Sequence, residues 1–273
     1  MPKIRIHDLD TYYEQAGAGV SLVFVHGAFA DARIWDPQWQ HFSTSHQLLR
    51  YDLRGHGRTG ASNLGHYCMA TFAGDLAALL DALEIACPVV CGLSWGGSIA
   101  QAFAVHSSER LKALILAGSA VSIRLTGMDK LLCDVLFPRW AMLLTIKSMR
   151  VENFTRFSLW LARLTRGEQW LSRDEAAGEY LKQCMLQMDS REYIKIWEAI
   201  YGFNLLPLER IPCPTLVLNG AHESSNTFRH TREILHRVPH AEGRVVPGAC
   251  HAMNRENPKG FNEHVAEFLG CLT

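Results

Sequence analysis

Short apolar runs alternate with amphipathic segments along most of this chain, and that alternation limits the folds open to it. The apolar runs predict strands at residues 3–7, 12–15, 21–26, 46–52, 88–93, 111–117, 215–218 and 243–246. Helical patterns separate several of them, at residues 36–42, 71–86, 98–106, 226–238 and 258–269. In residues 71–86 the leucines recur at helical spacing, at Leu76, Leu79, Leu80 and Leu83. Strands that alternate with helices are typical of an α/β fold with a mostly parallel sheet.

Residues 121–207 interrupt this alternation. They carry long helical patterns rich in Leu, Met, Trp and Phe, with few strand signals. A chain of 273 residues is long enough for one large α/β domain with an insertion. We therefore expect an α/β core made of residues 1–120 and 208–273, and a helical cap, or lid, made of residues 121–207.

Charge and composition exclude several classes of partner. The chain has 27 Lys and Arg against 27 Asp and Glu, whereas nucleic-acid binders and polybasic membrane-surface proteins are basic. No stretch approaches the about 20 consecutive apolar residues of a membrane-spanning helix, and the first residues contain no apolar signal-peptide segment. We expect a cytoplasmic protein with no nucleic-acid or membrane partner, while the sequence leaves its oligomeric state open.

Cysteine usage agrees with a reducing compartment. The eight cysteines are scattered, without a CxxC pair or zinc-ligand spacing. Their even number leaves disulfides formally possible, but we favour reduced thiols.

The strongest local motif is Gly92-Leu93-Ser94-Trp95-Gly96, a G-x-S-x-G sequence between a predicted strand and a predicted helix. A sharp strand-to-helix turn forces strained backbone angles on the serine and leaves no room for side chains two positions away. It also places the hydroxyl of Ser94 at a helix N-terminus, where N–H groups hold an anion. The motif predicts a nucleophilic serine; the alternative is an ordinary turn with a solvent-facing serine.

A nucleophilic serine needs a base, and the base needs an orienting carboxylate. His251 follows a late strand directly and precedes the last helix, so we expect it to be the base, with His222 as the nearer rival. Glu223 is the only carboxylate in the loop after residues 215–218, and we expect it to be the acid. Asp129 is the other candidate acid, although it lies within the helical insertion.

Acyl transfer also needs donors for the developing oxyanion, usually the largest electrostatic contribution. We expect one donor to be the backbone N–H of Trp95, directly after the nucleophile. The other should come from the loop after residues 21–26, where Gly27 permits a close backbone approach and Ala28 is the expected donor. Phe29, the next residue of this loop, is the alternative donor.

Taken together, these motifs resemble the α/β-hydrolase superfamily, over nearly the whole chain outside residues 121–207. The resemblance rests on His26-Gly27, on residues 52–57 (DLRGHG), on the Gly92–Gly97 turn, on residues 220–223 (GAHE) and on residues 248–251 (GACH). Within the superfamily the chain is similar to soluble esterases, enol-lactonases and acyl-homoserine-lactone lactonases. The resemblance implies a triad of Ser94, Glu223 and His251 under a helical cap. Family members commonly carry Asp where this chain has Glu223.

The expected cap is rich in large apolar residues, which favours a substrate with an apolar acyl chain or ring. We expect Phe29, Trp140 and Phe154 to contact it. Neither a metal-ligand set nor a dinucleotide motif is present in the sequence, so a cofactor-free reaction is expected. The prediction is hydrolysis of small carboxylic esters or lactones. The alternatives are a C–C bond hydrolase or a cofactor-free perhydrolase on the same scaffold, and a non-catalytic ligand receptor.

Overall fold

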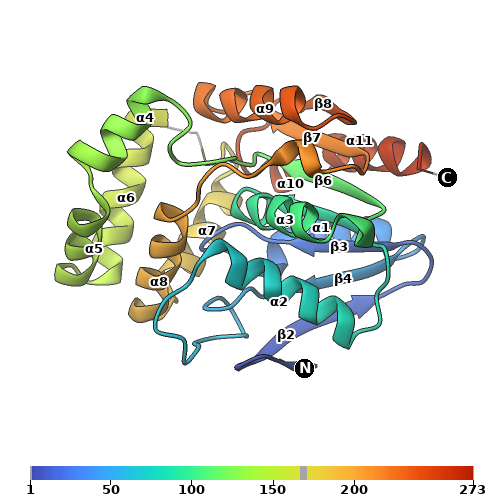
Figure 1. Ribbon diagram of the computed structural model, residues 1–273, viewed down its shortest axis with the longest axis horizontal. Coiled ribbons are helices and arrows are strands. Elements are labelled where there is room, and N and C mark those ends of the chain that lie inside the picture. The colour runs from blue at the N-terminus through green and yellow to red at the C-terminus, as the bar shows by residue number, and fades with distance from the viewer. Residues whose placement is uncertain (1, 167–170, 273) are drawn as a thin grey trace.

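A central twisted sheet organises the protein, as the alternation of strands and helices predicts. The computed structural model describes residues 2–166 and 171–272 (Figure 1). Its eight-stranded sheet has the order β1-β2-β4-β3-β5-β6-β7-β8. The strands are β1 (Lys3–Ile6), β2 (Leu9–Ala16), β3 (Ser21–Val25), β4 (Gln47–Tyr51), β5 (Val89–Leu93), β6 (Ala113–Ala117), β7 (Thr215–Gly220) and β8 (Ala241–Val246). Strand β2 pairs with both β1 and β4 in antiparallel fashion, and the strands from β4 to β8 are parallel to one another, which confirms the predicted fold class.

Helices cover both faces of this sheet because its inner strands are apolar on both sides. Successive residues of β5, such as Val89 and Val90, point to opposite faces and join different apolar clusters. One cluster includes α2 (Met69–Ala82), α3 (Trp95–His106) and α9 (Ser225–Arg237). The other includes η1 (Ala32–Trp35), α1 (Asp36–Phe42), α10 (Met253–Glu256) and α11 (Pro258–Gly270). Short 3₁₀ turns, η2 (Ser108–Arg110) and η4 (Leu208–Arg210), precede β6 and β7.

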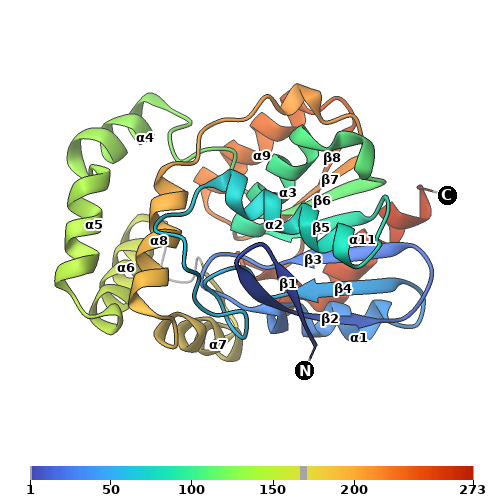
Figure 2. The same cartoon turned by 60° about the horizontal axis from the view of Figure 1, so that its bottom comes forward.

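The remaining helices gather at one side of the sheet (Figures 1 and 2). They are α4 (Gly127–Leu131), the π-helical turn η3 (Leu132–Leu136), α5 (Arg139–Ser148), α6 (Val151–Arg166), α7 (Glu175–Leu186) and α8 (Ser190–Tyr201). We call residues 121–207 the helical insert.

Polar contacts join the helical insert to the loops at the edge of the core. The hydroxyl of Tyr180 donates to Asp31 Oδ1 at 2.7 Å. From α8, Lys195 Nζ donates to the carbonyl of Ser62 at 2.8 Å, and the buried carboxylate of Glu192 accepts from Tyr67. Two helices of the insert therefore have defined positions over the loops that follow β3 and β4.

Element boundaries differ from the sequence prediction in two instructive places. The helix predicted at residues 98–106 begins at Trp95, because the chain turns directly from β5 into α3 at Ser94. The helix predicted at residues 71–86 is α2 and ends at Ala82. Glu84 then adopts a φ of 54°, in the left-handed region, which a continuing α-helix does not allow.

All eight cysteines are free thiols, and Cys91, Cys213 and Cys250 are buried. Within residues 2–166 and 171–272, the structure contains no helix with the length and apolar character of a membrane span.

Candidate active site

Ser94 lies at a strained turn between β5 and α3. Its backbone has φ 54° and ψ −117°, a region that residues with a side chain rarely adopt. A methyl group on Gly92 would clash with the backbone of Gly96, and one on Gly96 would clash with the carbonyl of Val25. The two glycines of the motif are thus required by close backbone packing, as the sequence motif predicts. Strain of this kind persists where the surrounding structure imposes it, and it is common at functional sites.

Glu223 and His251 lie in contact after the ends of β7 and β8. The Oε2 atom of Glu223 is 2.7 Å from Nδ1 of His251, and the Glu223 side chain is fully buried. The other carboxylate oxygen, Oε1, accepts from the backbone N–H of Ser224 at 3.0 Å and from the Thr227 hydroxyl at 3.2 Å. Both oxygens therefore have partners, and the imidazole is held in one orientation.

The pKa of Glu223 reflects these contacts. Burial by itself would raise the pKa of this carboxyl group, but the nearby His251 and the hydrogen bonds from Ser224 and Thr227 hold it below its usual value. Glu223 is therefore a carboxylate at neutral pH, and its Oε2 atom faces Nδ1 of His251.

Gly118, directly after β6, is a site residue that the sequence analysis missed. Its φ is 54°, and a methyl group there would lie 3.1 Å from Cε1 and Nδ1 of His251 and 3.4 Å from Oε2 of Glu223. Only glycine combines this backbone conformation with such a close approach. The signal available in the sequence was a glycine immediately after a buried strand.

Two residues that line the same cavity as Ser94, Ala28 and Trp95, have backbone N–H groups without a partner in the described chain. Trp95 is the first residue of α3, so its N–H has no acceptor within the helix. Within the described chain, neither this group nor the N–H of Ala28 has an acceptor. The N–H of Phe29, by contrast, donates to Nε2 of His56 at 3.1 Å. Phe29 therefore has no free N–H for a ligand, and Ala28 is the better candidate of the two.

Two buried histidines hold the loop that carries Ala28. His56 accepts from Phe29 through Nε2, so its proton is on Nδ1 and is donated to the carbonyl of Arg54 at 2.8 Å. His26 accepts from the N–H of Leu53 through Nε2 at 3.0 Å. Burial lowers the pKa of both imidazoles, that of His56 to about 3 with a further contribution from the neighbouring His26. Both rings are therefore neutral and serve as fixed hydrogen-bonding groups.

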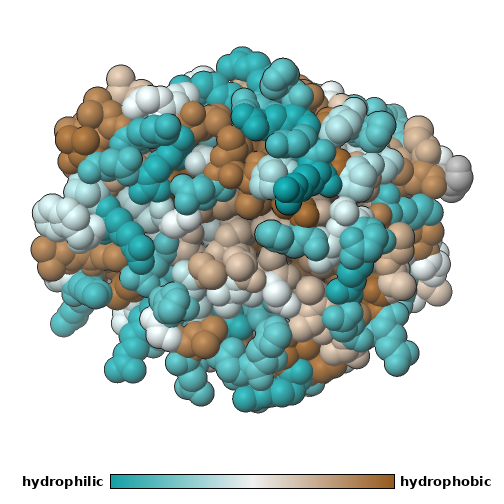
Figure 3. Space-filling model, in the orientation of Figure 1, coloured by the Kyte–Doolittle hydropathy of each residue, from teal (hydrophilic) through white to brown (hydrophobic). Residues whose placement is uncertain are grey.

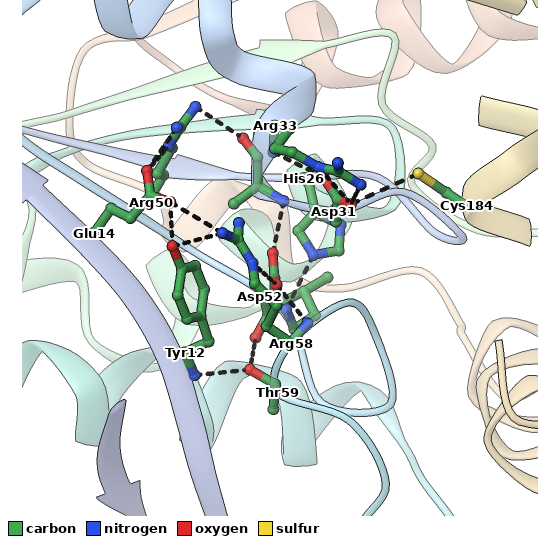
Figure 4. A network of polar contacts seen from close by, with 12 residues as sticks. Tyr12, Glu14, His26, Asp31, Arg33, Arg50, Asp52, Arg58, Thr59 and Cys184 are labelled. Atoms are coloured by element: carbon green, nitrogen blue, oxygen red, sulfur yellow. Dashed lines mark hydrogen bonds and ion pairs between the residues drawn. The ribbon is translucent and has the colours of Figure 1, made fainter. Parts of the chain in front are cut away.

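Asp52 joins the same loop to the one after β4. Its fully buried carboxylate accepts from the N–H of Ala32 and from the N–H of Arg58, each at 2.7 Å, and Figure 4 shows it between the two segments. A methyl group on Gly57 would clash with this carboxylate. The motif at residues 52–57 thus positions the loop that contains Ala28, rather than contacting the cavity at Ser94.

Ser94 and His251 line two adjoining cavities. The first, which we call the apolar cavity, has a volume of about 360 Å³ and is lined mainly by side chains such as Phe154, Phe157, Met185 and Trp197. The second, which we call the mixed cavity, has a volume of about 520 Å³ and also contains Asp129, Arg229 and His230. Residues of both the core and the helical insert line each cavity.

The three predicted substrate contacts have different positions. Phe29 and Phe154 line the apolar cavity. Trp140 lines neither cavity: it is 70% exposed, at the first turn of α5, and its ring lies on the outer side of the helical insert. The expectation that Trp140 contacts substrate does not agree with this geometry, and we remove it from the candidate site.

The two alternative residues, His222 as base and Asp129 as acid, have positions that fit these roles less well than those of His251 and Glu223. His222 is exposed and lines neither cavity. Asp129 lies in the mixed cavity, but its carboxylate caps α4 by accepting from the N–H and the hydroxyl of Thr126, both at 2.8 Å. His251 is paired with Glu223. No cluster of three or more potential metal ligands occurs among the described residues.

Comparison with known proteins relates this chain to hydrolases. The sequence profile described as "Alpha/beta hydrolase family" matches residues 22–264. The chain is 26% identical to 3-oxoadipate enol-lactonase 2 of Acinetobacter baylyi over 246 residues, covering 90% of this chain and 86% of that protein. It is 32% identical to 2-hydroxy-6-oxo-2,4-heptadienoate hydrolase of Pseudomonas putida over 127 residues, covering 44% and 46%. The crystal structure of the enol-lactonase from Burkholderia xenovorans aligns with a TM-score of 0.82 at 23% identity, covering 98% of this chain and 100% of that one.

Proposed function

Since this chain belongs to the alpha/beta hydrolase family, we propose that it is a serine hydrolase that cleaves carboxylic esters or lactones. The observation that carries the proposal is the pairing of the buried Glu223 with His251, which lines the same cavity as the strained Ser94. A serine, an imidazole and a buried carboxylate are the groups that an acyl-enzyme mechanism requires.

In the proposed mechanism, His251 removes the proton of the Ser94 hydroxyl as its oxygen attacks the substrate carbonyl. The tetrahedral oxyanion accepts hydrogen bonds from the N–H groups of Ala28 and Trp95. The C–O bond to the leaving group then breaks, and the imidazolium of His251 gives its proton to the leaving oxygen. Water, deprotonated by His251, hydrolyses the acyl-enzyme and regenerates Ser94. Glu223 stabilises the imidazolium that forms in each half-reaction.

We further propose that residues 121–207 act as a cap whose inner side recognises the substrate. Side chains from α5, α6, α7 and α8 line the apolar cavity together with Ser94. The volume of about 360 Å³ suits a small acyl chain or ring. The name of the Acinetobacter relative, an enol-lactonase, agrees with a cyclic or linear ester as substrate.

An active-site serine probe tests this proposal directly. We expect a fluorophosphonate to label the protein at Ser94, and p-nitrophenyl esters or lactones to be hydrolysed by the wild type but not by Ser94→Ala. Ser107→Ala is the matched control, because Ser107 lies at the far end of α3 and lines neither cavity. Full activity in Ser94→Ala would contradict the proposal.

A second candidate is hydrolysis of a C–C bond beside a ketone, since the Pseudomonas putida relative is named as a hydrolase of 2-hydroxy-6-oxo-2,4-heptadienoate, a compound with a ketone and no ester. The same serine and histidine would serve, but the leaving group would be a carbon atom that must be protonated. Turnover of a vinylogous 1,5-diketone with no turnover of esters or lactones would favour this candidate.

A further inference from the structure

The outer side of the helical insert is unusually apolar for a surface. Of the fourteen large hydrophobic side chains that are exposed among the described residues, nine lie between residues 128 and 160. We call Val135, Leu136, Phe137, Trp140, Leu144 and Trp160 the exposed face; Val135 is 65% and Trp160 57% exposed. Figure 3 shows brown, hydrophobic side chains gathered at the left edge, where Figure 1 places α4 and α5. Patches of this kind mark interaction sites.

The exposed face lies on a basic segment. Residues 121–161 contain six Lys and Arg and three Asp and Glu, a formal charge of +3, so the rest of the neutral chain carries −3. Lys130, Lys147 and Arg150 are exposed and form no ion pair with any residue that the structure describes. The whole-chain charge of zero, from which we expected no membrane partner, therefore conceals a basic segment next to exposed tryptophans.

The exposed face is continuous with the proposed active site. Phe137 is 44% exposed and also lines the mixed cavity, which contains Ser94 and His251. On α6, the ring of Trp160 lies 6.1 Å from that of Phe157, which lines the apolar cavity. Phe137 thus both meets solvent and lines a cavity, and Trp160 is separated from the apolar cavity by the ring of Phe157.

We propose that the exposed face binds an anionic lipid surface, with the mixed cavity next to the lipid. Exposed Trp and aliphatic side chains flanked by Lys and Arg are suited to the interfacial region of a bilayer. A second copy of this chain is the less favoured occupant, because two identical faces of charge +3 repel each other, whereas an anionic leaflet attracts one. Delivery of substrate from the lipid rests on the proposed hydrolase function, but the binding itself does not.

The test is cosedimentation with vesicles of phosphatidylcholine alone and of phosphatidylcholine mixed with phosphatidylserine. We expect binding to the mixed vesicles that weakens as salt is added. The triple variant Lys130→Gln, Lys147→Gln, Arg150→Gln should bind about a hundredfold more weakly, about fivefold for each charge removed. Trp140→Ser with Leu144→Ser should weaken binding at least about tenfold.

Matched controls separate the exposed face from general effects of charge and hydrophobicity. Lys3→Gln, Arg232→Gln and Lys259→Gln remove the same charge from exposed sites on the core, and Leu64→Ser with Val245→Ser remove exposed apolar side chains elsewhere. Both control sets should bind as the wild type does. Ser94→Ala should also bind fully, so a failure of the hydrolase proposal would remain distinguishable from a failure of this one.

Three results would overturn the proposal. The first is no binding to the mixed vesicles, and the second is binding that the triple variant leaves unchanged. The third is self-association in analytical ultracentrifugation, abolished by Trp140→Ser with Leu144→Ser, without vesicle binding; that result would assign the exposed face to a second copy.

Discussion

The carboxylate of Glu223 meets the imidazole of His251 at 2.7 Å between Oε2 and Nδ1, with the glutamate side chain fully buried. The two residues are 28 positions apart in the chain and follow neighbouring parallel strands, β7 and β8. Glutamate is one methylene longer than the aspartate that family members commonly carry here, and the hydrogen bonds from Ser224 and Thr227 hold the longer side chain in place.

Glu223→Gln should lower kcat by about 10⁴-fold, because an amide neither stabilises the imidazolium nor selects the correct tautomer of His251. Glu223→Asp retains the charge but withdraws the carboxylate, so a loss of about a hundredfold is expected. Steady-state kinetics with one ester substrate will measure both. Glu109→Gln, a change of the same kind at an exposed site in η2, is the control. Equal activity in Glu223→Gln and the wild type would rule out the proposed role.

The backbone strain at Ser94 predicts that replacing this residue by glycine stabilises the fold while it removes activity. Ser94→Gly should raise the free energy of unfolding by about 1 kcal/mol, because glycine adopts φ 54° without a steric penalty. Ser94→Ala removes the same hydroxyl but keeps the Cβ atom, so it should gain none of this stability. Urea unfolding of the two inactive variants compares them directly. A glycine variant no more stable than the alanine variant would show that the turn is unstrained.

The buried histidines predict a loss of stability in mild acid. The folded protein keeps His56 neutral, with its pKa lowered to about 3, whereas the unfolded chain protonates it near 6.5. The stability that this residue contributes is therefore complete above pH 6.5 and declines as the pH falls toward 3, by about 1.4 kcal/mol per pH unit. In urea unfolding at several pH values, His56→Gln should show a shallower decline than the wild type. His106→Gln, an exposed site at the end of α3, should not. Identical slopes for all three proteins would contradict this assignment.

A side chain in the wall of the apolar cavity should limit the length of the acyl chain that the protein accepts. Met185 lines this cavity, so Met185→Ala should favour longer acyl chains. We expect the ratio of kcat/KM for p-nitrophenyl octanoate over butanoate to rise about tenfold, since one methylene in a pocket is worth about 1–3 kcal/mol. Met128→Ala, at an exposed site of the same insert, is the matched control and should leave the ratio unchanged. A ratio unaffected by Met185→Ala would place the acyl chain outside the apolar cavity.

Much of the fold and the centre of the candidate site could be predicted from local sequence. Ser94 was identifiable because a strand, a sharp turn and a helix are all encoded within residues 88–106. Glu223 and His251 followed from their places directly after late strands, since the carboxyl ends of parallel strands meet at one edge of a sheet. The positions of these residues were open to prediction because each depends on short-range geometry together with the order of the strands, and their catalytic roles stay predictions.

Only the tertiary structure decided which side chains of the helical insert face inward. Trp140 and Met142 lie on the same helix and are both apolar, yet Met142 lines both cavities and Trp140 faces solvent. Helical periodicity identifies an apolar face only where the opposite face is polar, and α5 has apolar residues on both sides. The roles of His56 and Gly118 likewise depend on contacts between distant segments, because hydrogen bonding and close approach are properties of the packed chain.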